Sequence, residues 1–280
     1  GICECWTDDQ DGEGSIGETC TVAYQLIFYD QLLKLGLADS ALLGDLSERA
    51  IYNALFGAQS RDGRKIRYYT PLNGRRKFWK PDTYCCPNNF RRAISRLPEY
   101  VFYEDEDGIL ANLYTACSAK LKARGVTVSI NEKTDYPADG KIVFTLNPEK
   151  ETAFSFKLRL PRWCRNPAAR INGKNVTYRM TPGEMLVLPR VWRKGDCVEL
   201  DLPMEVRTVL GRQRQAGRFA VMRGPVVYGL NLASLQAFRD REPLDAATAL
   251  MVDPLSLAYA NGRIKARVST NDAAGGVAGA

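Results

Sequence analysis

Apolar side chains recur every three or four positions in the first 97 residues, which is the spacing of one face of an α-helix. Three helical segments are expected, in residues 20–35, 41–55 and 87–97. Gly36 would end the first segment, Ser40 would cap the second, and Pro87 suits the first turn of the third. Three amphipathic helices leave apolar faces without partners, so they are not expected to close into a domain of their own.

From residue 99 onward the apolar pattern changes to a period of two, which predicts β-strands. The acidic turn at 104–108 lies between two apolar runs and indicates a hairpin, and Asn172-Gly173 is a second hairpin turn. Further strands are expected in residues 126–130, 141–146, 153–160, 185–188, 197–202, 206–210 and 219–228. Many short strands at regular spacing predict an antiparallel, jelly-roll-like β-sandwich.

Together these patterns predict an α+β chain with several domains. The expected parts are a helical segment at 1–98, a β-sandwich at 99–205, a second β-rich segment at 206–270 and a disordered tail of small residues at 271–280. The chain opens Gly1-Ile2-Cys3, with neither an initiator Met nor a signal-peptide pattern. We therefore expect a fragment of a longer protein.

Composition limits the chemistry mainly through one missing residue type. The 280 residues include no histidine. This excludes from the chain a Ser-His-Asp triad, a Cys-His dyad, a histidine general base and any imidazole metal ligand. Catalysis here would have to use carboxylates, thiols, tyrosines or basic side chains.

The charge balance and hydropathy exclude two classes of partner. Lys and Arg number 39 against 32 Asp and Glu, a net charge of +7, and some of the basic residues lie among aromatic ones. We find no helix-turn-helix, zinc-finger or RNA-recognition pattern, so a nucleic-acid partner is not expected. No apolar stretch approaches the ~18 residues of a membrane helix, so no membrane partner is expected. Oligomeric state is left open, with a homodimer as one option.

Eight cysteines are the next notable feature of the composition. An even number would suit disulfides in a secreted protein. The chain is long enough to bury a core without them, however, and adjacent residues such as Cys85 and Cys86 are poorly placed for a bridge. Reduced thiols and a cytoplasmic location are therefore expected.

Glu18, Cys20, Cys85 and Cys86 are the first candidate site, because three thiolates and a carboxylate make a tetrahedral set suited to zinc. Zinc ribbons favour Cys-x-x-Cys spacing over adjacent cysteines, and buried structural thiols are the simpler alternative. A helix start at Cys86-Pro87 would favour a thiolate there.

Two further groups of residues have both a functional and an ordinary interpretation. An acidic stretch could supply a general acid or base, or could be a solvated loop. Its members are Glu4, Asp8, Asp9, Asp11, Glu13 and Glu18. An aromatic group could line a sugar subsite or pack in a core. Its members are Tyr68, Tyr69, Phe78, Trp79 and Tyr84.

Several motifs occur in a specific order along the chain. They are Gly-Glu-Thr-Cys at 17–20, Glu-Arg-Ala-Ile-Tyr-Asn at 48–53, Thr-Tyr-Cys-Cys-Pro-Asn-Asn at 83–89, Asn-Leu-Tyr at 112–114 and Leu-Pro-Arg-Trp-Cys at 160–164. Together they resemble glycoside hydrolase family 127, the zinc-dependent β-L-arabinofuranosidases, from residue 1 to about residue 230. The resemblance implies the C-terminal part of an (α/α)6 barrel followed by β-sandwich domains. The rest of the barrel, with the histidines of the family, would then lie upstream of Gly1.

The resemblance also implies a reaction, namely retaining hydrolysis of a terminal pentofuranoside in an oligosaccharide or glycoconjugate. Glu18, Cys20, Cys85 and Cys86 match the zinc ligands of the family, and Cys85 matches its nucleophile. A zinc-held thiol needs no histidine to activate it. Tyr68 resembles a tyrosine that contacts the sugar.

The acid/base carboxyl is assigned less directly. In the family it lies in a Gly-Glu-Ala-Phe setting upstream of the zinc motif, whereas Glu4 lies in Cys3-Glu4-Cys5-Trp6. Glu4 is the favoured candidate and Glu13 the alternative.

Two other functions are left open by the sequence. The chain could be an inactive fragment whose sandwich binds carbohydrate or serves a structural role, or it could be a dithiol redox protein. The second is disfavoured because the chain has no Cys-x-x-Cys motif on a thioredoxin-like pattern.

Overall fold

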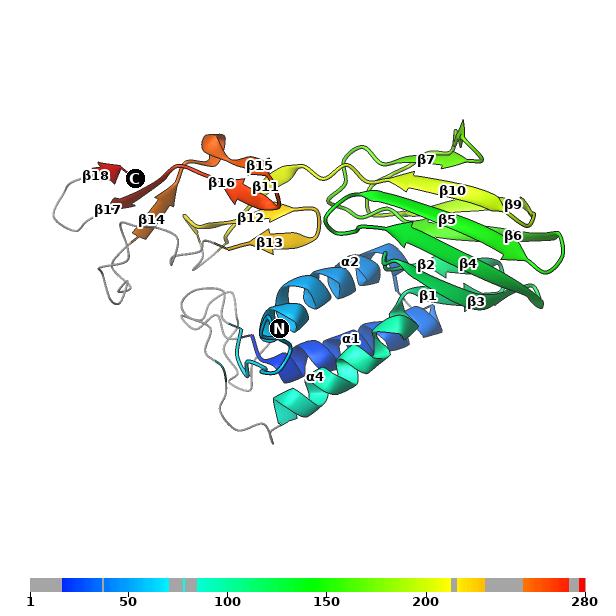
Figure 1. Ribbon diagram of the computed structural model, residues 1–280, viewed down its shortest axis with the longest axis horizontal. Helices are drawn as coiled ribbons and strands as arrows, with labels where there is room; N and C mark the ends of the chain where they lie inside the picture. The colour runs from blue at the N-terminus through cyan, green and yellow to red at the C-terminus, as the bar shows by residue number, and fades with distance from the viewer. Residues whose placement is uncertain are drawn as a thin grey trace. The chain divides into compact units, whose positions relative to one another are not determined.

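The computed structural model describes residues 17–36, 38–70, 78, 85–212, 216–229, 249–271 and 277–279 (Figure 1). Their contacts divide the chain into two units. The described residues of the first unit lie within Gly1–Glu205, Arg212–Ala216 and Gly224–Val226. Those of the second lie within Val206–Gly211, Gly217–Arg223 and Val227–Ala280. The first unit contains the helices and the β-sandwich.

The helices follow the predicted segments, with a change at one cap. They are α1 (Thr19–Leu35), α2 (Ser40–Ala50), the π-helical turn η1 (Ile51–Leu55), α3 (Phe56–Ala58), α4 (Cys85–Arg96) and the 3-10 turn η2 (Leu97–Tyr100). Gly36 ends α1 in the left-handed region, at φ 62°, as expected. Ser40 was wrongly expected to cap α2. The cap is Asp39, whose carboxylate accepts from the N–H groups of Ala41 and Leu42 at 3.0 and 3.1 Å.

Helix α1 packs against α4, and the turns η1 and η2 lie beside these two helices. The buried residues of this cluster are Val22, Ala23, Leu26, Ile51, Leu55, Phe90, Ala93 and Tyr100. On the opposite face of α1, Tyr24, Phe28 and Leu35 are 56%, 59% and 64% exposed. Helical spacing brings these three onto one stripe, so α1 keeps an exposed apolar face among the described residues, as the sequence predicted.

Two sheets form the sandwich of the first unit. The four-stranded sheet has the order β1 (Phe102–Asp105), β2 (Gly108–Ala111), β6 (Thr152–Arg159), β9 (Met185–Trp192). The six-stranded sheet has the order β3 (Cys117–Ala123), β4 (Val126–Thr134), β5 (Lys141–Pro148), β10 (Asp196–Asp201), β7 (Ala168–Ile171), β8 (Lys174–Asn175). Phe144, Phe156 and Trp192 are wholly buried between them. These two sheets are consistent with the expected sandwich, but β2 and β6 pair in parallel, whereas antiparallel pairing was expected.

The hairpin predicted at Asn172-Gly173 is confirmed by the antiparallel pairing of β7 with β8. The sequence prediction missed β3, although its residues alternate, because three of its four apolar positions hold only Cys or Ala. β3 reads Cys-Ser-Ala-Lys-Leu-Lys-Ala, and only its last residue is buried. The strand expected at 219–228 is in fact two strands, β12 (Phe219–Arg223) and β13 (Val226–Tyr228), because Gly224-Pro225 makes a turn between them.

The second unit consists of short antiparallel strands. Strand β11 (Val206–Leu210) pairs with β12, and β14 (Ala249–Val252) pairs with β17 (Val268–Asn271), which also pairs with β18 (Val277–Gly279). A further hairpin joins β15 (Ala258–Ala260) to β16 (Arg263–Lys265), and a 3-10 turn, η6, spans Pro254–Ser256. Of the predicted tail, residues 272–276 and 280 lie outside the described residues.

One buried arginine joins α2 to the sandwich. The guanidinium of Arg159, at the end of β6, is wholly buried and donates to Asp45 at 2.5 Å and to Glu48 at 2.6 Å. Its Nε donates to the carbonyl oxygen of Asn112 at 2.6 Å. An i,i+4 pair of Asp45 with Arg49 would suit the sequence, but Asp45 pairs with Arg159 instead. A Cβ on Gly44 would collide with the Arg159 side chain, so a glycine is needed where the helix passes it.

Candidate metal and nucleophile site

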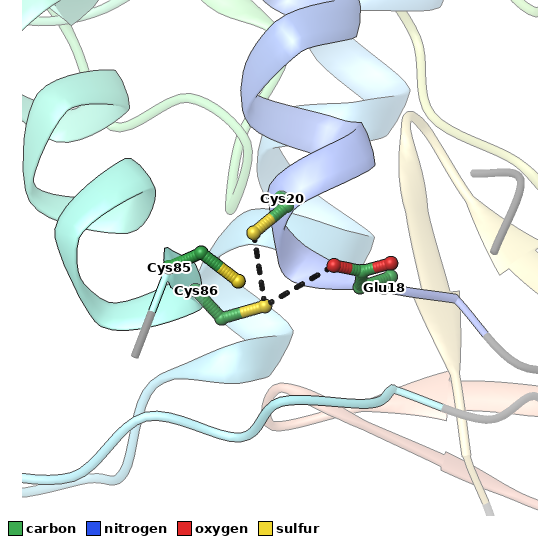
Figure 2. A group of neighbouring side chains, drawn as sticks. All are labelled: Glu18, Cys20, Cys85 and Cys86. Atoms are coloured by element: carbon green, nitrogen blue, oxygen red, sulfur yellow. Dashed lines mark hydrogen bonds between the residues drawn. The ribbon is translucent and has the colours of Figure 1, made fainter. Parts of the chain in front are cut away.

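Four side chains from the starts of α1 and α4 meet at one point (Figure 2). Glu18 immediately precedes α1, Cys20 lies in its first turn, and Cys85 and Cys86 begin α4. Their ligand atoms all lie within 4.8 Å of one another. The Sγ atoms of Cys20 and Cys86 are 3.2 Å apart, and Cys86 Sγ lies 3.7 Å from Glu18 Oε1. The structure thus brings together the four residues matched to zinc ligands.

Backbone pairing positions the Glu18 end of this cluster. Residues 68–70 run antiparallel to 17–19: the N–H of Thr19 donates to Tyr68 O at 3.0 Å, and the N–H of Thr70 donates to Gly17 O at 2.7 Å. The Thr19 hydroxyl also donates to the Arg67 carbonyl oxygen at 2.8 Å. This short ladder holds the start of α1 beside the Tyr68 segment.

An asparagine on α4 positions the first thiol. The side-chain amide of Asn89 donates to Cys20 Sγ at 3.3 Å, and its carbonyl oxygen accepts from Arg92 at 2.9 Å. Asn89 is itself buried. A thiolate gains from such a donor, since hydrogen bonds to a charged acceptor are stronger than neutral ones. Sequence reasoning did not single out Asn89, although its place three residues after Cys86 on a helix could have indicated it.

Cys85 differs from the other members of the cluster in its surroundings. Its side chain is exposed, whereas Glu18, Cys20 and Cys86 are buried. The Tyr68 hydroxyl lies 3.6 Å from Cys85 Sγ, and the hydrogen bond from Tyr68 lowers the pKa of the Cys85 thiol. Burial raises the pKa of Cys20 to about 11 and also raises the pKa of Cys86. Among the three cysteines, Cys85 is therefore the one that solvent and a ligand can reach.

The donor chemistry fits zinc. Three sulfur atoms and one carboxylate oxygen suit a tetrahedral Zn²⁺ site, whereas Ca²⁺ and Mg²⁺ prefer oxygen ligands alone. With Zn–S bonds of about 2.3 Å, tetrahedral geometry places sulfur atoms roughly 3.8 Å apart, close to the separations in this cluster. Two buried thiols beside a buried carboxylate are costly as anions unless a cation offsets their charge. Glu18, Cys20, Cys85 and Cys86 could hold such an ion.

The structure describes some of the other predicted site residues and not others. Tyr68 and Tyr69 lie beside the cluster, with ring centroids 4.6 Å apart. Phe78 packs under the guanidinium of Arg67, 4.1 Å from ring centroid to Cζ. Glu4 and Glu13, the two acid/base candidates, lie outside the described residues. Trp79 and Tyr84 also lie outside them.

Two family profiles match this chain and show which proteins it is related to. The profile for the beta-L-arabinofuranosidase GH127 catalytic domain matches residues 6–99, and that for the GH127 middle domain matches residues 108–204. The chain belongs to glycoside hydrolase family 127. The resemblance noted in the sequence is confirmed by both matches. No described helix of this GH127 chain is long and apolar enough to cross a membrane.

Individual relatives agree with the GH127 assignment. A non-reducing end beta-L-arabinofuranosidase from Bifidobacterium longum subsp. longum is 30% identical over 81% of this chain and 37% of its own length. The crystal structure of a GH127 beta-L-arabinofuranosidase from Geobacillus stearothermophilus T6 is 27% identical, with a TM-score of 0.73 over 94% of this chain and 44% of that one. A solved GH127 beta-arabinofuranosidase is 25% identical, with a TM-score of 0.74 over 98% and 47%. The chain thus spans less than half the length of these relatives.

Proposed function

We propose that this GH127 chain carries the nucleophile of a retaining glycosidase that removes terminal β-L-arabinofuranosyl residues from an oligosaccharide or glycoconjugate. The observation that carries the proposal is the position of Cys85. It is the exposed member of a cluster whose other three members are buried. The names of the related proteins support the choice of sugar, since the Bifidobacterium and Geobacillus relatives are both beta-L-arabinofuranosidases.

Glu18, Cys20, Cys85 and Cys86 would hold a zinc ion in this proposal. Zinc, when bound, keeps its thiol ligands deprotonated at neutral pH. The chain has no histidine to take the proton from a nucleophile, so its thiol has to be held as a thiolate by its environment. Tyr68 contributes to that environment, because its hydroxyl donates toward Cys85 Sγ over 3.6 Å and orients the sulfur.

The first step is a displacement at the anomeric carbon. The Cys85 sulfur forms a bond to that carbon while the bond from the carbon to the leaving oxygen breaks. A carboxylic acid donates its proton to the departing oxygen, and Glu4 is the proposed donor, with Glu13 as the alternative. The product is a thioglycosyl-enzyme with inverted configuration. Tyr68 lies where its ring and hydroxyl could also contact the sugar.

The second step releases the sugar. The same carboxylate takes a proton from water, the water oxygen attacks the anomeric carbon, and the carbon–sulfur bond breaks to regenerate the thiolate. Because each step inverts the configuration, the product keeps the configuration of the substrate.

Mass spectrometry of the acid-quenched reaction tests this mechanism. Incubation of the full chain, supplied with zinc, with a nitrophenyl β-L-arabinofuranoside should add one pentosyl group, mapped to the peptide that contains Cys85. Cys85→Ala should show no adduct. Cys197→Ser is the matched control, since Cys197 is a partly buried thiol on β10, and should keep the adduct on Cys85. An adduct on another side chain, or product of inverted configuration by NMR, would overturn the proposal.

A further inference from the structure

An open hollow of about 420 Å³ is lined by residues of β9, at the edge of the four-stranded sheet, and by residues in β7 and just after β8 of the six-stranded sheet. Its lining is Ile171, Tyr178, Leu188, Pro189, Arg190 and Val191. None of these residues belongs to the Cys85 cluster, which lies at the starts of two helices. The hollow is therefore separate from that cluster and has its own set of side chains.

The lining combines an aromatic side chain with aliphatic surface. Tyr178 is 50% exposed and Val191 is 49% exposed, whereas Leu188 is buried. Pro189 is also exposed. A half-exposed phenol ring next to aliphatic side chains offers a flat apolar surface with a hydroxyl at its tip, and such a surface accepts the C–H face of a ligand ring.

One charged side chain lines the hollow, and it is held in place. The Arg190 guanidinium stacks over the Trp192 ring, 5.0 Å from its centroid, and lies 3.8 Å from Asp196 Oδ2. Stacking fixes the orientation of the guanidinium, whose five N–H groups are all donors. The Asp196 carboxylate compensates its charge, so the site has directed donors without a strong preference for an anion.

The position of Pro189 argues against a peptide ligand. An exposed edge strand such as β9 is the usual place for a peptide to add as a further strand. Proline has no N–H, so Pro189 interrupts the ladder in the middle of β9. A neutral ligand with ring faces and many hydroxyl groups fits the remaining features: stacking on Tyr178 and acceptance of hydrogen bonds from Arg190.

We propose that this hollow is a glycan-binding site, separate from the catalytic cluster, that takes a neutral arabinose-containing oligosaccharide chain. Tyr178 stacks on a sugar ring and Arg190 donates to hydroxyl oxygens. The choice of arabinose rests on the function proposed above, whereas the choice of a neutral glycan rests on the lining. Binding here would hold a polymeric substrate on the sandwich.

Affinity electrophoresis of the full chain, in native gels that contain soluble arabinan, tests the site. The wild-type chain should be retarded by arabinan and not by dextran. Tyr178→Ala should weaken the apparent affinity about fivefold, which is the loss expected for one stacked aromatic ring. Tyr178→Phe should stay close to wild type because it keeps the ring. Tyr24→Ala is the matched control, since Tyr24 lies on α1 and is 56% exposed, and it should migrate as wild type.

Several results would overturn the site. They are an unretarded wild-type chain, a Tyr178→Ala variant retarded as strongly as wild type, and a Tyr24→Ala variant that loses as much affinity as Tyr178→Ala. Equal retardation by dextran would overturn the arabinose preference.

Hydrolysis of a nitrophenyl β-L-arabinofuranoside separates this proposal from the catalytic one, because so small a substrate reports on the Cys85 cluster alone. Tyr178→Ala should hydrolyse it at the wild-type rate. If wild type hydrolyses it but arabinan does not retard the chain, the glycan site fails and the catalytic proposal stands. If retardation depends on Tyr178 and no hydrolysis occurs, the glycan site stands and the catalytic proposal fails.

Discussion

Cys20 Sγ lies 3.2 Å from Cys86 Sγ, although 66 residues separate the two in the chain. The contact exists because α1 and α4 pack together with their first turns at the same end. Both helices then direct their positive N-terminal ends toward the sulfur atoms, which favours negative charge at this point. Helix packing, and not local sequence spacing, creates the donor set.

The first prediction concerns metal content. Purified chain dialysed against zinc should retain about one ion, because four donors suit one tetrahedral site. Cys86→Ala should retain far less, since it removes a buried ligand atom from the centre of the cluster. Elemental analysis by mass spectrometry measures this, with Cys197→Ser as the control that keeps its zinc. Equimolar zinc in Cys86→Ala would contradict the assignment.

The second prediction concerns Asn89, which positions Cys20 without being a proposed ligand. Loss of a hydrogen bond to a ligand typically weakens metal affinity about 10- to 100-fold. We expect Asn89→Ala to show a decrease of this size in competition with a chelator, while the ratio of zinc to protein at saturation is unchanged. Asn88→Ala is the matched control, because Asn88 lies next to it but is exposed. Equal affinities for the two variants would show that the contact has no effect.

The third prediction concerns the pH dependence of stability. Burial raises the pKa of Glu132 from 4.5 to about 8, although the N–H of Thr115 donates to its carboxylate at 2.9 Å. Between pH 4.5 and about pH 8, the Glu132 carboxyl therefore keeps its proton in the folded chain and releases it in the unfolded chain. Its contribution to stability is fully present below pH 4.5 and is lost as the pH rises to about 8.

Glu132→Gln tests this prediction because glutamine keeps the acceptor oxygen and does not titrate. Between pH 5 and pH 8 the free energy of unfolding of the variant should rise relative to wild type by about 1–3 kcal/mol, measured by urea denaturation. The exposed Glu149→Gln should follow wild type at both pH values. An unchanged difference between Glu132→Gln and wild type would contradict the role of burial.

The fourth prediction concerns Arg159, which pairs with Asp45 and Glu48. Arg159→Met should lower the free energy of unfolding by about 3–5 kcal/mol, because the buried Glu48 loses its charge partner. Arg170→Met is the control, since Arg170 pairs with Glu199 at 3.8 Å on the surface and should lose less than about 1 kcal/mol. Similar losses for the two variants, measured by urea denaturation, would contradict the importance of the buried pair.

The sequence predicted the helices and most of the strands because their apolar patterns are clear. It missed β3, whose apolar positions are mostly the small residues Cys and Ala, and it missed Asp39, which caps α2 in place of Ser40. The four donors of the cluster could be named from motif resemblance. Their separation could not, because the approach of two helix starts depends on packing between distant segments.

The Arg159 contacts show most clearly what lay beyond sequence reasoning. Glu48, Asn112 and Trp163 were noted as parts of three separate motifs. In the structure all three contact one network: Glu48 and the Asn112 carbonyl accept from Arg159, and Trp163 donates to Glu48 at 3.3 Å. Arg159 itself belongs to none of those motifs, so no pattern in the sequence connects them.

The pairing of Arg159 with Glu48 also constrains how such chains can change by recombination. A gene segment that encoded the sandwich alone would separate the buried Arg159 guanidinium from its carboxylates. A segment that encoded the helices alone would leave those carboxylates without the guanidinium. Either exchange leaves a buried charge uncompensated. Although the family profiles divide the chain between residues 99 and 108, we expect the helices and the sandwich to be inherited together.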